Sequence, residues 1–128
     1  MSIPAAAAIA FAATTALVVA FQAALALGAP WGAYAMGGAI RGRMPPPLRV
    51  AAVVQGLLLI GVALIVLADA ALVSVGLVNA WPWLTWIPVA VSAIAVVLNG
   101  STRSRGERRI WLPVSLVLLV SSLAVALG

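Results

Sequence analysis

The sequence contains no cysteine, no histidine and no lysine, and it has only two acidic residues. The lack of cysteine excludes disulfides, thiol nucleophiles and soft-metal sites, and the lack of histidine removes the usual haem ligand and the side chain that titrates near neutral pH. Two carboxylates leave few candidates for general acid–base or nucleophilic chemistry. The sequence therefore predicts a protein that is not an enzyme and that has no metal and no cofactor.

Charge is also scarce, because 7% of the 128 residues are charged and 66% are hydrophobic. A soluble domain has about 25% charged residues, so this composition indicates an integral membrane protein. The absence of lysine, combined with heavy use of alanine, valine and glycine, is typical of a GC-rich genome and suggests a bacterium.

The arginines fall in two short stretches, 41–49 and 103–109. They are Arg41, Arg43, Arg49, Arg103, Arg105, Arg108 and Arg109. Arginine-rich loops stay on the cytoplasmic side of a membrane, which predicts a multi-pass protein of the bacterial inner (plasma) membrane with both termini outside. Both stretches border apolar spans, so we expect the arginines to contact anionic membrane lipids and not nucleic acid.

Four apolar runs are long enough to cross a bilayer. They cover about residues 3–27, 48–68, 83–98 and 110–127, joined by arginine-rich cytoplasmic loops at 28–47 and 99–109. Pro45, Pro46 and Pro47 mark the start of the second span, and Asn99-Gly100 is suited to a helix C-cap. Ser104 and Glu107 have the spacing of a capping box, so the fourth helix should begin inside its loop.

The predicted fold is thus all-α: a single transmembrane domain, residues 1–128, that forms a four-helix bundle from two antiparallel hairpins. The apolar residues that continue from Asp69 to Ala80 exceed one crossing. They indicate a tilted helix, a helix that overruns the membrane, or a short interfacial segment.

Two glutamines are candidates for an intramembrane polar pair. Gln22 precedes the inner end of the first span by about as many residues as Gln55 follows the inner start of the second, so their depths should match within a few Å at about 1.5 Å per residue. Two amides at one depth can hydrogen-bond to each other, which is the interpretation we favour. The alternative is a polar patch that lines a pore or a substrate pocket.

Asp69 is the candidate ionisable site, because a carboxylate inside a membrane helix is costly and usually functional. It lies a full crossing beyond Leu48, however, which favours a solvated position at the outer end of the helix. Glu107 is explained more simply as a helix cap or as a partner for the nearby arginines.

The first span carries small residues at four-residue spacing, a pattern that lets another helix approach closely. The candidate packing face consists of Ala16, Ala20, Ala24, Gly28 and Gly32. It predicts close packing within the chain, a homo-oligomer, or a membrane-protein partner.

The stretch that follows, GAPWGAYAMGGAIRG, is apolar and rich in glycine. It predicts either a re-entrant element that could line a ligand site or an interfacial loop whose Trp31 and Tyr34 lie among headgroups.

The segments GAPWGAYAMGG, PPPLRV and NGSTRSRGERRIWLP resemble a group of small bacterial four-span membrane proteins without an established activity. The resemblance covers about a third of the chain and implies a plasma-membrane protein with four helices. In size and span number the chain is also similar to small multidrug resistance transporters. Those transporters carry an essential carboxylate in their first helix, whereas residues 3–27 contain no acid.

We therefore expect a structural or accessory role that involves binding lipid or another membrane protein. The alternative is a small homo-oligomeric transporter or channel, with a polar path that includes the two glutamines.

Overall fold

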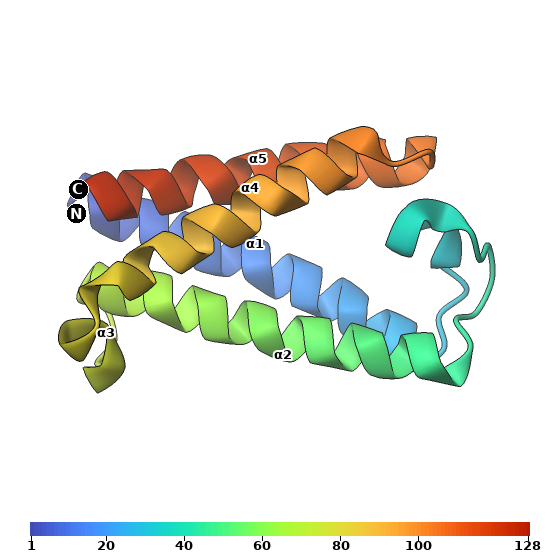
Figure 1. Cartoon of the computed structure of the whole chain (residues 1–128), viewed down its shortest axis with the longest axis horizontal. Coiled ribbons are helices and arrows are strands. Elements are labelled where there is room, and N and C mark those ends of the chain that lie inside the picture. Colours follow the sequence, from blue (N-terminus) through green and yellow to red (C-terminus); the bar gives the residue numbers. More distant parts are fainter.

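The computed structural model describes all 128 residues, which form helices and no strand (Figure 1). The α-helices are α1 (Ile3–Ala26), α2 (Pro46–Asp69), α3 (Gly76–Ala80), α4 (Trp86–Ser101) and α5 (Arg105–Leu127). Three 3₁₀ turns are η1 (Gly32–Tyr34), η2 (Met36–Gly38) and η3 (Pro82–Thr85).

Four helical segments are long and apolar enough to cross a membrane: Ile3–Ala26, Pro46–Asp69, Pro82–Ser101 and Arg105–Leu127. The shortest has 20 residues, which at about 1.5 Å per residue matches a hydrocarbon core of about 30 Å. The four-helix, multi-pass architecture expected from the sequence is confirmed. The apolar residues after Asp69 include a separate short helix, α3, in place of a continuation of α2.

The two hairpins are α1–α2 and α4–α5. Both arginine-rich connections lie at one end of the bundle, and the termini and α3 lie at the other end (Figure 1). We call these ends the basic end and the terminal end. At the terminal end Gly128 lies directly against the Pro4 ring.

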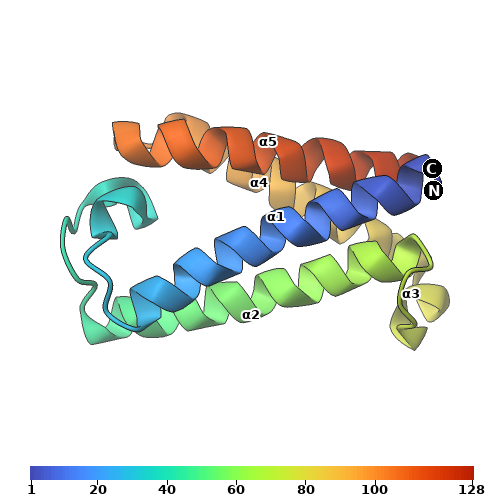
Figure 2. The same ribbon diagram turned by 180° about the vertical axis from the view of Figure 1, so that it is seen from behind.

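The helices do not pack as four equal neighbours. α1 packs against both α2 and α5, and α4 packs mainly against α5, whereas α2 and α4 make few contacts. α1 runs obliquely from the C-terminal end of α5 toward the start of α2 (Figure 2), and the hairpins separate toward the basic end. The segment between α1 and α2 folds into the space between them (Figures 1 and 2).

Local sequence signals set the helix ends. The Ser2 hydroxyl accepts a hydrogen bond from the Ala5 amide at the start of α1. At the end of α1, Gly28 adopts φ +99°, and the Ala29 amide donates to the Ala24 carbonyl. This is a Schellman motif, in which glycine has the left-handed conformation that other residues rarely adopt.

Two boundary predictions are corrected. α2 begins at Pro46, two residues before Leu48, because prolines are tolerated at the first helical positions. α4 does not end at Asn99-Gly100 but continues through Ser101, so the second basic turn shrinks to residues 102–104. The Asn99 side chain donates to the Trp111 carbonyl of α5, which ties the last turn of α4 to its neighbour.

The helix α5 begins inside the predicted loop, as the capping signal indicates. The Ser104 hydroxyl accepts a hydrogen bond from the Glu107 amide at 3.1 Å. The Glu107 carboxylate does not complete the box by returning to Ser104. It accepts a hydrogen bond from the Gly37 amide instead.

The small-residue stripe is not a continuous helix face. Because α1 ends at Ala26, Gly28 and Gly32 lie beyond the helix, and the prediction that they extend its packing face is wrong. Gly32 is buried in the connecting segment, where its amide donates to the Gly42 carbonyl.

Apolar residues form two separate clusters. The cluster toward the terminal end contains Ala8, Phe11, Val62, Ala63, Val66, Leu118 and Val125, and the cluster at the basic end contains Leu25, Ala35, Met44 and Ala52. The second cluster holds the connecting segment against α1 and α2 through Ala35 and Met44.

We predict that Gly32→Ala destabilises the protein, because an added Cβ would meet the backbone carbonyls of Ile40 and Gly42. Overpacking of this kind costs about 1–3 kcal/mol. The thermal midpoint in mild detergent should therefore fall clearly for Gly32→Ala. Gly42→Ala is the matched control, since a Cβ there meets nothing within 4 Å. Equal midpoints for the two variants would contradict the described packing of this segment.

Candidate functional site: a polar cavity at the basic end

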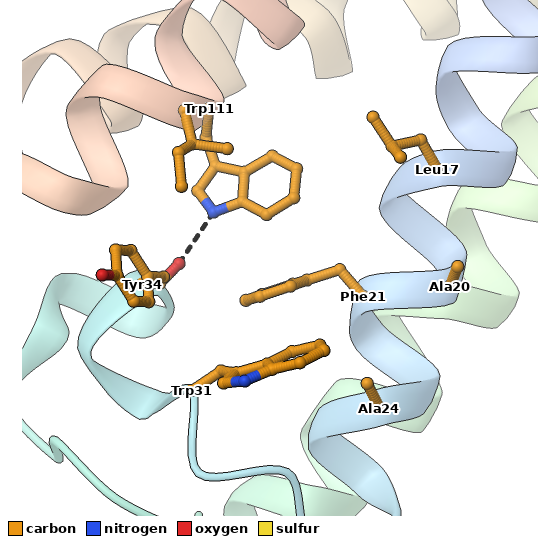
Figure 3. Close-up of a pocket in the computed structure, with 8 residues that line it drawn as sticks. Leu17, Ala20, Phe21, Ala24, Trp31, Tyr34 and Trp111 are labelled. Atoms are coloured by element: carbon orange, nitrogen blue, oxygen red, sulfur yellow. Dashed lines mark hydrogen bonds between the residues drawn. The ribbon is translucent and has the colours of Figure 1, made fainter.

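The segment between α1 and α2 is docked on the first turns of α5 by three hydrogen bonds. The Gly37 amide donates to Glu107 Oε2 at 2.9 Å, and the Ser104 hydroxyl donates to the Ala33 carbonyl at 2.7 Å. Trp111 Nε1 donates to the Tyr34 carbonyl at 2.7 Å (Figure 3). The segment is thus packed into the bundle by specific contacts with a hairpin distant in sequence.

Aromatic rings surround this contact (Figure 3). The Trp111 ring lies 4.6 Å from Phe21, and Phe21 stacks on Trp31 with an interplanar angle of 11°. The Tyr34 ring lies against Gly106, where a side chain would collide with it. A glycine at position 106 therefore lets the segment approach α5 closely.

A cavity of about 380 Å³ lies where the two hairpins and this segment meet. Its lining comes from α1, α2, α4, α5 and residues 34–36. Most of the lining is apolar, but four polar side chains reach it: Gln22, Gln55, Asn99 and Glu107. The sequence has only six Asn, Gln, Asp and Glu residues, so two thirds of them converge here, one from each long helix.

The two glutamines meet, as the sequence predicts. Gln22 Nε2 donates to Gln55 Oε1 at 3.1 Å, and the small Gly56 next to Gln55 faces the Gln22 side chain. Gln22 Oε1 is buried and accepts no hydrogen bond from the protein.

Two of the polar side chains at the cavity, Asn99 and Glu107, each keep an oxygen without a partner within the chain. Asn99 Nδ2 donates to the Trp111 carbonyl, and Asn99 Oδ1 accepts no hydrogen bond within the chain. Glu107 is 8% exposed and uses one oxygen on the Gly37 amide, and none of the nearby arginines forms an ion pair with it. It lies in the first turn of α5.

Asp69 lies elsewhere. It is exposed, it is the last residue of α2, and the Thr85 hydroxyl donates a hydrogen bond to its Oδ2 atom at the terminal end. The structure therefore separates this carboxylate from the polar cavity by most of the bundle length. The solvated position at a helix end, which we favoured from the sequence, fits this placement.

The helical part of the small-residue stripe lies mostly on the bundle surface. Ala16 and Ala20 are exposed, and Ala24 is half-buried. Ala20 and Ala24 line an apolar groove of about 480 Å³ (Figure 3). Phe21, Tyr34 and Trp111 line both this groove and the polar cavity, so these three rings form the wall between them.

The arginines divide into two groups. Arg49 donates to the Ala26 carbonyl and Arg108 to the Thr102 carbonyl, which caps the ends of α1 and α4. The side chains of the other five, Arg41, Arg43, Arg103, Arg105 and Arg109, donate no hydrogen bond within the chain.

Sequence reasoning missed the roles of Asn99 and Glu107. Asn99 was predicted as a cap and Glu107 as a cap or an arginine partner, and the structure places both side chains at the cavity. The available signal was the depth of Asn99 and Glu107, which lie at the same end of the bundle as the glutamines. No three His, Cys, Asp or Glu side chains come together as a group that could hold a metal ion.

No protein-family model matches this chain, and neither the curated proteins nor the solved structures contain a match. The resemblance to small bacterial four-span proteins therefore stays a prediction, and the function must be argued from the site.

We predict that the two glutamines are energetically coupled. Gln22→Leu and Gln55→Leu should each lower the free energy of unfolding by about 1 kcal/mol, because each leaves an unpaired amide among apolar groups. The double variant should cost less than the sum, with a coupling of about 0.6 kcal/mol. Reversible unfolding in mixed micelles of the wild type and the three variants measures this cycle. Strictly additive losses would contradict the hydrogen bond.

Proposed function

We propose that this protein is a non-enzymatic, membrane-embedded binding protein for a small amphipathic molecule with a hydrogen-bond-donating, cationic head. The observation that carries the proposal is the convergence of Gln22, Gln55, Asn99 and Glu107 on one largely apolar cavity. Polar side chains in membrane helices are costly, so their gathering at one place favours recognition of a ligand.

The charge of the ligand head follows from the polar atoms of the cavity side chains that have no partner within the chain. Glu107 and Asn99 each keep an oxygen without a partner within the chain, and the amide nitrogens of Gln22, Gln55 and Asn99 each keep at least one free N–H. Because neutral amides can both donate and accept, the carboxylate of Glu107 decides the charge that the cavity prefers. A buried carboxylate without a positive partner is stabilised by a ligand that brings the opposite charge. An ammonium group brings this charge together with N–H donors for the carboxylate.

The remaining walls suit an apolar body. Leu58, Leu59, Val91, Ala95 and Leu98 contribute aliphatic surface, and Phe21, Tyr34 and Trp111 contribute rings that attract cations through their π-faces. The aliphatic residues come from α2 and α4, which make few contacts with each other. A lipid-like molecule could therefore enter sideways between these helices.

The alternative is a small transporter or channel with a polar path. The packing of the terminal half of the bundle favours binding over conduction. The apolar cluster around Phe11, Val66 and Leu118 lies there, and the buried Ser121 and Ser122 hydroxyls donate to carbonyls of their own helix. A polar route across the membrane would have to pass through this packed region, and the cavity occupies only the basic half.

We place the protein in the bacterial plasma membrane, with the basic end toward the cytoplasm and both termini outside. The clustering of all seven arginines at one end supports this orientation. Membrane lipids surround the bundle. The exposed Ala16 and Ala20 offer a surface of small side chains for a second copy of the chain or another membrane protein.

We predict saturable binding of radiolabelled decylammonium to the protein in zwitterionic nanodiscs, after subtraction of empty nanodiscs. Decanol and decanoate, which share the chain but not the head, should compete weakly. Glu107→Gln should lower the affinity for decylammonium about tenfold or more, because it removes a charge-assisted contact but keeps an oxygen that can accept from Gly37.

Asp69→Asn is the matched control, since it removes the same charge at the opposite end of the bundle. It should bind decylammonium like the wild type. Equal losses in the two variants would indicate attraction by overall charge, and wild-type affinity in Glu107→Gln would refute the assigned site.

A further inference from the structure

The polar cavity is one of two hollows beside η2. On the outer side of the connecting segment, a cleft of about 650 Å³ opens at the basic end. Arg41 comes to this cleft from the first connection, Arg103 from the second, and Arg105 from the first position of α5. The residues are more than 60 positions apart in sequence, and the hydrogen bond from Ser104 to the Ala33 carbonyl holds the two connections together beside the cleft.

The three arginines have no negative partner within the chain. None of them forms an ion pair or donates a hydrogen bond to the protein, and no acidic residue lines the cleft. Glu107, the nearest acid in sequence, is turned into the polar cavity and bonded to Gly37. Like charges brought to one cleft repel each other, so this arrangement favours an anion from outside the chain.

The other walls leave room for that anion. Ala33, Gly37, Gly38 and Ala39 have small or no side chains, and a Cβ on Gly37 would meet nothing within 4 Å. Arg105 is also the first residue of α5, a 23-residue helix whose N-terminus adds a positive partial charge on the same side.

We propose that this cleft binds a phosphate group, held between Arg41, Arg103 and Arg105. Guanidinium groups match phosphate oxygens with paired hydrogen bonds, and three of them suit a dianionic phosphomonoester better than a singly charged phosphodiester. The group is either the headgroup of a lipid such as phosphatidate or a soluble phosphate compound. The phosphate site is independent of the polar cavity, since the two are lined by different residues.

The test uses the full chain in phosphatidylcholine nanodiscs doped with phosphatidate or with phosphatidylglycerol. Native mass spectrometry after gentle release from the nanodisc counts the retained lipids. The wild type should retain one phosphatidate in preference to phosphatidylglycerol, which is anionic but is a phosphodiester. Equal retention of the two lipids, or retention of neither lipid together with no effect of pyrophosphate, would overturn the proposal without any variant being needed.

A matched pair of variants locates the site. Arg41→Gln with Arg103→Gln and Arg43→Gln with Arg109→Gln each reduce the net charge from +5 to +3, but only the first pair lies in the cleft. The cleft variant should bind phosphatidate or pyrophosphate at least about tenfold more weakly than the wild type, and the control variant should bind them like the wild type. Equal losses would show that overall charge is responsible and would overturn the proposal.

Inorganic pyrophosphate, titrated into undoped nanodiscs and into phosphatidate-loaded protein, distinguishes the two sources. Phosphatidate that pyrophosphate does not displace indicates a lipid headgroup. Pyrophosphate that binds in undoped nanodiscs, displaces the lipid and is lost in the cleft variant indicates a soluble phosphate compound. Either result supports a phosphate site, and neither depends on decylammonium binding.

Discussion

Most of the basic end depends on how the segment between α1 and α2 is held. Three hydrogen bonds join this segment to the first turns of α5, through Gly37 and Glu107, Ala33 and Ser104, and Tyr34 and Trp111. Irregular backbone in a membrane protein is tolerated only where protein or water satisfies its polar groups. These contacts, together with the backbone hydrogen bond between Gly32 and Gly42, supply partners for a stretch that contains only two short 3₁₀ turns.

The same docking gives the two ends of the bundle different character. At the terminal end the helices meet in an apolar cluster around Phe11 and Val66. At the basic end the hairpins separate, and the segment between α1 and α2 fills part of the space between them. Polar side chains from all four long helices line the polar cavity that is left there. Gly37 belongs to the wall between two unlike hollows, because its amide binds Glu107 of the polar cavity while its open side borders the arginine cleft. The proposed cation site and the proposed phosphate site thus lie on opposite sides of this short stretch of backbone.

The sequence predicted the helices well because hydropathy and arginine position are properties of single segments. Four spans, two hairpins, the start of α5 inside its loop and the contact between Gln22 and Gln55 all follow from length, depth and capping rules. The wrong predictions concern residues whose role depends on the rest of the fold and not on their sequence neighbours alone. Asn99-Gly100 resembles a cap, but Asn99 bonds to Trp111 of α5, and Gly28 resembles part of a packing stripe, but it reverses the chain.

The cavity itself could not be predicted from the sequence. Glu107 suits a capping box or an arginine pair equally well by spacing, and only the fold of residues 32–38 supplies the Gly37 amide that it binds. A periodic pattern of apolar residues does not predict how this segment docks, because its contacts with Ser104 and Trp111 use backbone carbonyls. The convergence of four polar side chains depends on the angle between the hairpins, which many small contacts determine together.

The central claim is that Gln22, Gln55, Asn99 and Glu107 form one binding site for an amphipathic cation. The most direct measurement is native mass spectrometry of the protein released from the membrane in which it was made, for the wild type and for Glu107→Gln. The account predicts a defined amine-containing adduct of about one per chain on the wild type that is absent from Glu107→Gln. If both proteins carry only phospholipids in the proportions of that membrane, the cavity is not a ligand site and the account is wrong.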